Sequence, residues 1–578
     1  MQYNHGVIEH LPATWTTLTA TGSPFALSDA TVRGIPMKVF TAAPPNMRAI
    51  WEAAAQHGDK DYVVYEDERY TYSEIAAQVR ALSWRLRDVH AVGPGDRVAI
   101  AMRNYPEWVV AYWATLVVGA AVVGMNAWWT GTEMEYGLLD SAPKVLIADS
   151  ERIVRALPHL ARVRADHPLE VITVRMADAP AGTTAWTDAT CALDVPTTLP
   201  HAAIDPDDDA CIFYTSGTTG FPKGAQLTHR GCVTNLMHLG FWANVVGLST
   251  AAAAKSSGAP ASLSPPTVAP AFMAPTPLFH VTANNCLLHP ATLSGAKIVF
   301  TYKWDPGRAL ELIEREKVTN FSGVPTMSRE LLVHPDWSRR DTSTIAAMGG
   351  GGAALQPDLV DKIEKSLSGG QPSTGYGLTE TCGIVTANSA AFYLAKPASC
   401  GPLMPTFEAK LVDDDDNEVG PGLPGQLCVR GPAVIRGYLN QPEATADAIR
   451  DGWFNTGDIA RIDDDGFVYI VDRAKDMVLR GGENVYCSEV ETAIYEHPSV
   501  AEVAVFAIPD ERLGEEVGAG VFPHPGAEID EASLQAFLDG RIAKYKIPAR
   551  IWILDEAIPR NASGKLVKRE LKTRLLGT

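Results

Sequence analysis

The chain has 578 residues, a formal net charge of −19 and a hydrophobic fraction of 46%. This length exceeds what one hydrophobic core usually supports, so we expect at least two domains, and the supply of apolar and aromatic residues excludes global disorder. The acidic excess argues against nucleic acid as a partner, because phosphate backbones are bound by basic surfaces.

The eight cysteines and the N-terminus bear on cellular location. No two cysteines are close enough in the sequence to form a Cys-x-x-Cys motif, so we interpret them as reduced thiols of a cytoplasmic protein. Residues 1–6 lack the basic and apolar regions of a signal peptide.

The first third of the chain alternates helical and extended patterns. Strands separated by helices are typical of a doubly wound parallel sheet, so we expect an α/β fold there. The predicted elements are strands at 97–102, 120–123, 145–148 and 171–174, and a helix at about 106–118.

The stretch 108–132 contains no charged residue and is long enough to cross a membrane. Gly119 and Gly124 interrupt it, and buried strands of parallel sheets also form continuous apolar runs. We therefore predict a buried helix followed by a buried strand, with no transmembrane segment.

A loop rich in glycine and hydroxyl groups follows the apolar run 210–213. It reads Tyr214-Thr-Ser-Gly-Thr-Thr-Gly-Phe-Pro-Lys-Gly224. Backbone N–H groups, hydroxyls and one lysine after a strand suit a polyphosphate ligand. The common phosphate loop ends in Gly-Lys-Ser/Thr, whereas here Lys223 follows Pro222, so that loop is excluded.

The later part of the chain changes character. Residues 249–270 are small and unpatterned, which predicts a mobile surface loop, and short strands with turn residues dominate after about residue 400. We expect a β-rich region up to a boundary at 472–475 and then a compact α+β unit. That unit has a capping box at 488–491 opening a helix that stops before Pro498, a strand at 500–508, a helix at 531–545 and a strand at 550–554.

Six segments together resemble the adenylate-forming (AMP-binding) superfamily, and within it the fatty-acid and other carboxylic acid–CoA ligases, the acyl-CoA synthetases. They are 214–224, 275–281, 373–381, 454–459, 472–486 and 557–565, so the resemblance covers roughly 50–575. It implies a large N-terminal AMP-binding domain (1–471) with doubly wound parallel sheets and a β-rich subdomain. A hinge (472–475) and a small mobile α+β C-terminal domain (476–578) would follow.

The resemblance implies an ATP site. Tyr376 would stack on the adenine, Asp458 would accept bonds from the ribose hydroxyls, and Arg473 would contact the nucleotide. Mg²⁺ bridging the phosphates would be held by Thr218 and Glu380. The complete ATP/AMP set is Thr215, Ser216, Gly217, Thr218, Thr219, Gly220, Lys223, Gly351, Gly352, Ala353, Gly375, Tyr376, Gly377, Asp458 and Arg473.

The expected catalyst is Lys565. A carboxylate must attack the α-phosphorus of ATP, and a cation placed there stabilises the charge that develops on the phosphoryl group and the departing pyrophosphate. Thr379 and Glu380 would assist through the metal, and His280 would position the carboxylate beside the acyl tunnel.

The second half-reaction requires a thiol, which the resemblance identifies as coenzyme A. After the C-terminal domain turns about Lys475, the thiol arm would meet Arg480, Gly481, Gly482, Glu483 and Lys546. The acid would lie in a pocket formed by His280, Gly351, Gly375, Cys382, Gly383 and Ile384. Small residues at several of these positions favour a medium- or long-chain fatty acid.

Alternatives stay open at this point. In place of a fatty acid, the substrate would be an aryl, arylalkanoic or steroid side-chain acid. In place of transfer to coenzyme A, the adenylate would react with an amine or be oxidised as in a luciferase. An inactive adenylate-binding scaffold is the alternative outside enzymes, against which the intact Lys565, Glu380 and Asp458 argue. The sequence leaves the oligomeric state open between a monomer and a homodimer.

Overall fold

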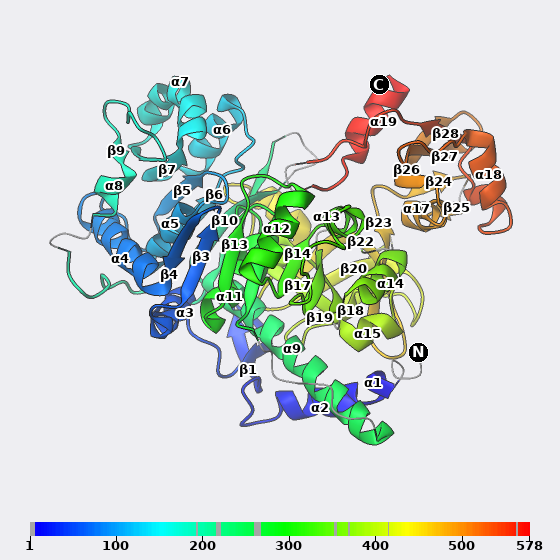
Figure 1. Cartoon of the computed structure of the whole chain (residues 1–578), viewed down its shortest axis with the longest axis horizontal. Helices are drawn as coiled ribbons and strands as arrows, with labels where there is room; N and C mark the ends of the chain where they lie inside the picture. The colour runs from blue at the N-terminus through cyan, green and yellow to red at the C-terminus, as the bar shows by residue number, and fades with distance from the viewer. Residues whose placement is uncertain are drawn as a thin grey trace.

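The computed structural model describes residues 6–191, 195–215, 221–258, 268–351, 355, 357–367, 370–413, 415–481, 483–561 and 564–577. Figure 1 shows a large body that contains the N-terminal sheets and a smaller unit, β24 to α19, joined to it at one side. The α/β architecture with a large N-terminal and a small C-terminal domain is therefore confirmed.

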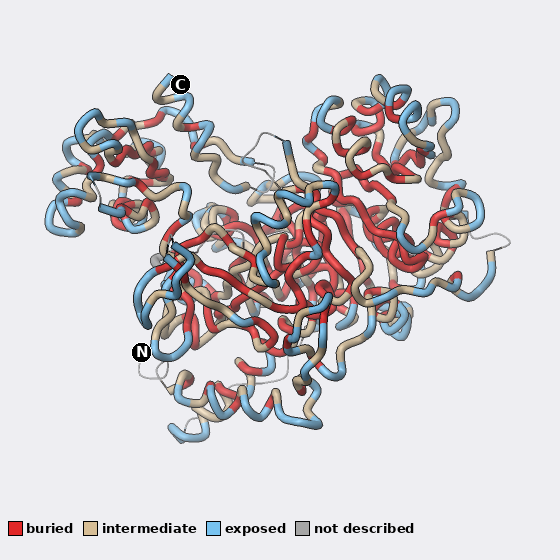
Figure 2. Tube along the Cα trace, turned by 180° about the vertical axis from the view of Figure 1, so that it is seen from behind, coloured by how far each residue is buried: buried red, intermediate tan, exposed pale blue. Residues whose placement is uncertain are grey.

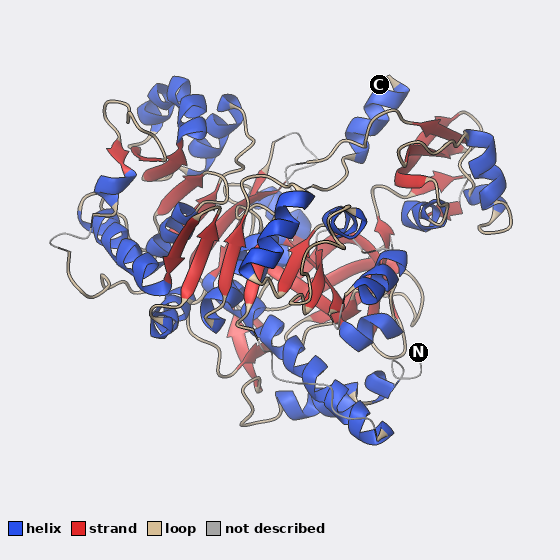
Figure 3. Ribbon diagram, viewed as in Figure 1, coloured by secondary structure: helices blue, strands red, loops and turns tan. Residues whose placement is uncertain are grey.

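Two sheets with parallel centres form most of the large domain (Figure 3). In the first, β5 pairs in parallel with β6 and β7, as strands joined by covering helices do. Its order is β11 (Lys223–Thr228), β10 (Asp209–Thr215), β6 (Ala121–Gly124), β5 (Arg97–Ala101), β7 (Val145–Asp149), β8 (Glu170–Val174), β9 (Thr184–Ala185).

The second sheet carries the glycine-rich strands of the predicted nucleotide site. Its central strands are parallel, and β16 pairs antiparallel with β17 at one edge. The order is β17 (Gly383–Ser389), β16 (Gln371–Leu378), β15 (Ala347–Gly351), β14 (Asn320–Gly323), β12 (Ala271–Ala274), β13 (Lys297–Phe300), β3 (Asp61–Tyr65), β4 (Glu68–Thr71).

Helices cover these sheets, and a third, antiparallel sheet forms the predicted β-rich region. The longer helices are α4 (Tyr72–Asp88), α5 (Pro106–Val117), α6 (Gly131–Ser141), α7 (Ser150–Asp166), α12 (Pro306–Glu316), α13 (Pro325–Val333) and α14 (Pro357–Ser366). The third sheet has the order β18 (Gly401–Pro402), β23 (Phe467–Arg473), β22 (Trp453–Ile462), β20 (Gly425–Arg430), β19 (Glu408–Val412), with β21 (Ile449–Arg450) beside β22.

The uncharged stretch lies in the core, as the sequence predicts. Nearly all of α5 and all of β6 are buried, and Figure 2 shows the buried chain concentrated in the centre of the large body. In the part of the chain that the structure describes, one helix, α9 (His229–Ser257), has the length and apolarity of a membrane span, a property that core helices of soluble proteins share.

The prediction of a surface loop at 249–270 is wrong for residues 249–257, and residues 259–267 of it lie outside the described part of the chain. α9 continues to Ser257 and ends at Gly258, which adopts the left-handed conformation that terminates helices. The run of four alanines at 251–254 favours helix, which explains the error. The N-terminal helices α1 (Gly6–Glu9) and α2 (Leu11–Thr19) pack along α9 (Figure 1).

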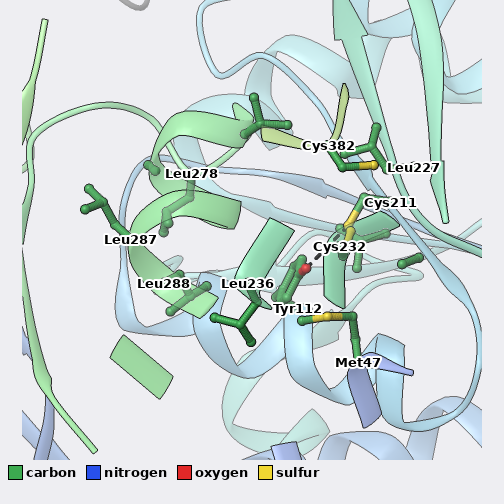
Figure 4. Close-up of a cluster of buried hydrophobic side chains, with 14 of the residues drawn as sticks. Met47, Tyr112, Cys211, Leu227, Cys232, Leu236, Leu278, Leu287, Leu288 and Cys382 are labelled. Atoms are coloured by element: carbon green, nitrogen blue, oxygen red, sulfur yellow. Dashed lines mark hydrogen bonds between the residues drawn. The ribbon is translucent and has the colours of Figure 1, made fainter. Parts of the chain in front are cut away.

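A cluster of thiols and apolar side chains lies where α5, α9 and β10 meet (Figure 4). Cys211, Cys232 and Cys382 are fully buried there, and the Tyr112 hydroxyl lies 3.3 Å from the Cys211 sulfur. Burial raises the pKa of the Cys211 thiol. All eight cysteines are free in this structure.

The small domain is a five-stranded sheet with helices on it. The sheet has the order β25 (Glu483–Val485), β24 (Val478–Arg480), β27 (Gly514–Pro523), β26 (Val500–Asp510), with β28 (Arg550–Ile553) beside β27. Its helices are α17 (Cys487–Tyr495), α18 (Glu531–Leu538) and α19 (Lys568–Leu576).

Two local predictions for the small domain are wrong. Ser488 does not cap α17, because the helix begins one residue earlier and the Ser488 hydroxyl donates to the Val471 carbonyl. The predicted helix at 531–545 ends at Leu538, after which Asp539 is extended. The domain boundary at 472–475 stays a prediction.

Candidate functional site

Three side chains form the predicted nucleotide cluster, one from β16 of the second sheet and two from the paired strands β22 and β23 of the third sheet. The Tyr376 hydroxyl on β16 donates to Asp458 Oδ2 at 2.7 Å, and Arg473 Nε lies 2.9 Å from Asp458 Oδ1. Asp458 is 2% exposed, and burial raises its pKa against the lowering effect of Arg473. Burial and the adjacent Asp458 raise the pKa of Tyr376. The cluster offers a ring, a carboxylate and an exposed guanidinium to one ligand.

Glu380 lies in a short 3-10 turn, Thr379–Thr381, directly after β16. Its Oε1 accepts hydrogen bonds from the Tyr438 hydroxyl at 2.9 Å and from the Thr215 hydroxyl at 3.5 Å. Lys223 extends its ammonium to 5.0 Å from the Tyr438 ring. The end of the phosphate loop and the predicted metal ligand therefore meet, and Tyr438, which lies in no recognised motif, joins them.

Several predicted residues lie outside the described part of the chain. They are Ser216, Gly217, Thr218, Thr219 and Gly220 of the phosphate loop, Gly352 and Ala353 beside the nucleotide, and Gly482 of the thiol loop.

Gly377 near the end of β16 and Gly351 at the end of β15 differ in why glycine is present. A side chain at Gly377 would place Cβ 1.8 Å from the Gly383 carbonyl oxygen, so the pairing of β16 with β17 requires glycine there. At Gly351 the corresponding Cβ would lie 3.4 Å from the Gly375 oxygen, an ordinary contact. Sheet packing thus does not require glycine at 351, and close approach of a ligand remains the predicted reason for glycine there.

Lys565 reaches this cluster from the small domain. It lies on a hairpin in which Asn561 Oδ1 accepts from the Lys565 N–H at 3.0 Å and the Asn561 N–H donates to the Lys565 carbonyl at 2.9 Å. The residue as a whole is exposed, but its ammonium is desolvated, which lowers its pKa together with the charge of Arg473. Asp458 and Glu380 oppose that shift, so the charges of the predicted nucleotide and metal ligands act on the ammonium.

His280 follows a loop that Asn104 holds in place. Asn104 Oδ1 accepts from the Leu278 N–H at 2.9 Å, and its Nδ2 donates to the Thr276 carbonyl at 2.9 Å. His280 keeps part of its surface exposed, but desolvation of the imidazole and the charge of Lys565 lower its pKa to about 4. The imidazole is therefore neutral near pH 7 and close to the Lys565 ammonium.

The predicted acid-pocket residues after Glu380 pack against α9. Cys382 is fully buried, and a side chain at Gly383 would place Cβ 2.2 Å from Asn235 Oδ1. That same oxygen accepts from the Ile384 N–H at 2.9 Å. Packing alone thus explains the glycine at 383, and the roles of Cys382, Gly383, Ile384 and Gly375 in holding the acid stay predictions.

The predicted thiol-binding cations are paired inside the small domain. Arg480 binds both carboxylate oxygens of Glu516 at 2.7 Å, and the Lys546 ammonium lies 2.7 Å from both oxygens of Glu489. Gly481 has a φ of 58° in the turn between β24 and β25, a conformation that favours glycine. In this arrangement each cation has a carboxylate partner in its own domain.

The described residues contain no cluster of three or more His, Cys, Asp or Glu side chains that would hold a metal by itself. The oxygens around Glu380 nevertheless suit Mg²⁺, which takes one or two carboxylates and completes its shell with substrate phosphates and water. Thr215, whose hydroxyl already contacts Glu380, belongs to the same oxygen-rich corner.

Comparison with known proteins agrees with this geometry. The chain matches the AMP-binding enzyme family over residues 50–439 and the AMP-binding enzyme C-terminal domain over 489–565. It is 35% identical to a feruloyl-CoA synthase of Amycolatopsis sp, covering 87% of this chain and 94% of that protein. It is 32% identical to a long-chain-fatty-acid–CoA ligase of Bacillus subtilis (strain 168), covering 90% and 92%.

Solved structures share the fold. ATP-bound MatB from Rhodopseudomonas palustris aligns with a TM-score of 0.75 and 29% identity, covering 91% of this chain and 98% of that one. The anthranilate CoA ligase AuaEII with anthranoyl-AMP aligns with a TM-score of 0.78 and 25% identity, covering 92% and 97%. The chain belongs to the AMP-binding enzyme family and is an acyl-CoA synthetase, an acid–thiol ligase that works through an acyl-adenylate.

Proposed function

We propose that this enzyme joins a carboxylic acid to coenzyme A with ATP and Mg²⁺, releasing AMP and pyrophosphate, and that Lys565 is the catalyst of the first step. The observation that carries the proposal is the docking of the lysine hairpin on the large domain, where Arg560 donates to the Thr326 hydroxyl at 3.3 Å. The charges of Arg473, Asp458 and Glu380 act on the desolvated Lys565 ammonium there. A cation enclosed beside a nucleotide cluster stabilises charge far more than a solvated one.

In the first step a carboxylate oxygen attacks the α-phosphorus, and the bond to pyrophosphate breaks. Asp458 holds the ribose and Tyr376 supports the adenine, while neutral His280 donates or accepts a hydrogen bond at the acid without competing for a proton. Mg²⁺ at Glu380, with a threonine hydroxyl, would offset phosphate charge. Lys565 remains next to the leaving group throughout.

In the second step the thiol sulfur attacks the acyl carbonyl, and the bond to AMP breaks. The hairpin with Lys565 must leave before the thiol loop at 478–485 reaches the adenylate. We assign the turn to Lys475, between the last strand of the large domain and β24.

For the acid, we propose a medium- or long-chain fatty acid first. This choice follows from the relative named long-chain-fatty-acid–CoA ligase and from the small residues predicted for the acid pocket. The second candidate is an aryl acid, since relatives are named feruloyl-CoA synthase and 4-coumarate–CoA ligase.

A panel of acids tests this proposal. Pyrophosphate release with ATP and Mg²⁺ would be compared for octanoate, palmitate, ferulate, 4-coumarate and benzoate, followed by thioester formation with coenzyme A or an amine. Selective use of the straight chains supports the fatty-acid proposal, and selective use of ferulate or coumarate replaces it. Absence of pyrophosphate release with every acid of both classes would overturn the substrate proposal.

A further inference from the structure

A two-residue turn near the N-terminus holds an arginine in an unusual backbone conformation. The turn joins β1 (Leu27–Val32) to β2 (Ile35–Phe40), an antiparallel pair whose register leaves two residues between the strands. These residues, Arg33 and Gly34, both have positive φ, at 49° and 82°. Turns of this kind favour Asn-Gly, and a bulky side chain is disfavoured at positive φ. The turn itself therefore gives no reason for arginine at position 33.

The Arg33 side chain extends from this hairpin into the large domain. Its Nη2 donates to the Val434 carbonyl at 2.8 Å. The residue keeps exposed surface, but desolvation of the guanidinium lowers its pKa, and the charge of Asp207 opposes that shift. A desolvated donor needs an acceptor, which the Val434 carbonyl supplies. The hairpin fits closely beside this contact, since a Cβ at Gly452 would lie 2.5 Å from Ile35 Cδ1.

The segment that Arg33 contacts, residues 434–438, also holds Glu380. The Ile435 N–H donates to the Glu380 carbonyl at 2.9 Å. The Tyr438 hydroxyl donates to Glu380 Oε1, also at 2.9 Å. One short segment thus fixes both the backbone and the carboxylate of the predicted metal ligand.

The same segment is bonded to β11, the strand that follows the phosphate loop. The Gln226 N–H donates to the Gly437 carbonyl at 3.0 Å, and the Gln226 carbonyl accepts from the Arg436 N–H at 3.0 Å. Directly after the segment, the Leu439 N–H donates to the Gly224 carbonyl at 2.8 Å. A shift of this segment would therefore move the metal ligand relative to the end of the phosphate loop.

We propose that Arg33 is a positioning residue for adenylation. By binding the Val434 carbonyl it holds segment 434–438 where that segment presents Glu380 to Mg²⁺ and the phosphates. The inference rests on the proposed function, in which Glu380 binds the metal. β1 and β2 precede residue 50, where the match to the AMP-binding enzyme family begins, so this support comes from outside the matched region. Arg33 acts through Glu380 and not on a reactant.

Arg33→Asn separates this role from a purely structural one. Asparagine suits the first position of the turn but is too short to reach Val434, so the thermal unfolding temperature should be unchanged or higher. The Mg²⁺ concentration for half-maximal pyrophosphate release should rise about five- to tenfold, and the rate at saturating Mg²⁺ should stay within about twofold of wild type. Arg33→Lys keeps a long charged donor and should recover most of the loss.

Lys38→Ala is the matched control. Lys38 lies on β2 of the same hairpin, and its ammonium pairs with Asp29 of β1 at 2.8 Å, with both side chains largely exposed. Exposed ion pairs contribute little to stability. The loss of this cation should therefore leave both the Mg²⁺ requirement and the unfolding temperature unchanged.

Two results would overturn the inference while the proposed function stands. One is an unchanged Mg²⁺ requirement in Arg33→Asn. The other is a lower unfolding temperature with an equal fall in rate at every Mg²⁺ concentration, which would show that the side chain only stabilises the fold. Wild-type enzyme that releases pyrophosphate equally well without Mg²⁺ rejects this inference together with the metal role in the proposed function.

Discussion

The two domains contribute to the site in different ways. The large domain holds its nucleotide cluster by its own bonds, from Tyr376 to Asp458 at 2.7 Å and from Arg473 to Asp458 at 2.9 Å. The small domain supplies Lys565 through a hairpin, whose Gly564 lies against Val324. Nucleotide binding is thus built into one domain, and the catalyst is brought to it by the other.

The two functional loops predicted for the small domain differ in what they contact. The lysine hairpin is docked on the large domain, whereas the cations of the thiol loop region, Arg480 and Lys546, are paired with glutamates of their own domain. Figure 1 shows the small unit attached at one side of the large body. This arrangement suits the first half-reaction, and the second requires the domain to turn.

The largest difference that we expect between the two domains is in their stability toward acid, which should destabilise the large domain. His229, His238 and His289 are fully buried in the large domain, and burial lowers their pKa values to about 4, 3 and 3. An unfolded histidine binds a proton below about pH 6.5, whereas these folded ones stay neutral to about pH 4, so stability falls as the pH falls through that window. The three together should cost about 4 kcal/mol of unfolding free energy at pH 5.5.

Urea unfolding at pH 7.5 and 5.5, followed by tryptophan fluorescence, measures that loss in the large domain, because Trp552 is the one tryptophan after residue 476. His238→Gln, which retains a polar group for the Thr406 hydroxyl 2.8 Å away, should reduce the pH dependence by about a third. Equal stability at both pH values would show that these histidines are not buried in neutral form.

Removal of the catalyst should have the next largest effect. Lys565→Ala should lower the rate of pyrophosphate release about 100- to 1,000-fold, corresponding to about 3–4 kcal/mol of transition-state stabilisation. ATP binding should change little, because Asp458 and its partners are held within the large domain. Single-turnover pyrophosphate release and nucleotide titration measure the two effects.

Lys544→Ala is the control for that experiment, since Lys544 is an exposed lysine of the same domain. Thioester formation from supplied acyl-adenylate should survive in both variants. Unimpaired adenylation by Lys565→Ala would remove the catalytic role that we assign to this residue.

The motifs predicted candidate site residues, but not the residues that support them. Tyr376, Asp458, Glu380 and Lys565 were identifiable because their reactions require particular groups in short ordered segments. Tyr438, which bonds to Glu380, lies in no such segment, because only the tertiary fold brings it there. Asn104 and Asn235 were missed for the same reason: each supports a loop far from it in the sequence.

The fold was predictable where periodicity was strong. The four predicted strands of the first sheet, β5 to β8, and helix α5 agree with the sequence within a residue or two, whereas β9 and β11 of that sheet were not predicted. The errors occurred where the same residues are compatible with two local structures. The alanine run in 249–257 was interpreted as loop but is helical, and Ser488 was interpreted as a helix cap although its hydroxyl donates to the Val471 carbonyl. Local patterns do not determine which partner a side chain finds.

Restricting the hinge should slow the second half-reaction alone. Lys475→Pro fixes one backbone angle and constrains the preceding residue, so the small domain should turn less readily. Thioester formation from supplied adenylate should fall about tenfold, whereas pyrophosphate release should change less than about twofold. Lys475→Ala, which leaves the backbone free, should behave like wild type, and an equal loss in both variants would place the effect in the side chain instead.

The smallest effect should come from the support of the metal ligand. Tyr438→Phe removes the hydroxyl that donates to Glu380 Oε1 at 2.9 Å and retains the ring near Lys223. A hydrogen bond to a carboxylate in a partly buried site is worth about 1 kcal/mol, so half-maximal adenylation should require about fivefold more Mg²⁺. Tyr136→Phe, which removes a hydroxyl bonded at 3.0 Å to the Pro222 carbonyl, is the control and should not alter the Mg²⁺ requirement. If Tyr438→Phe changes the rate at saturating Mg²⁺ but not the Mg²⁺ requirement, Tyr438 positions the nucleotide loop rather than Glu380.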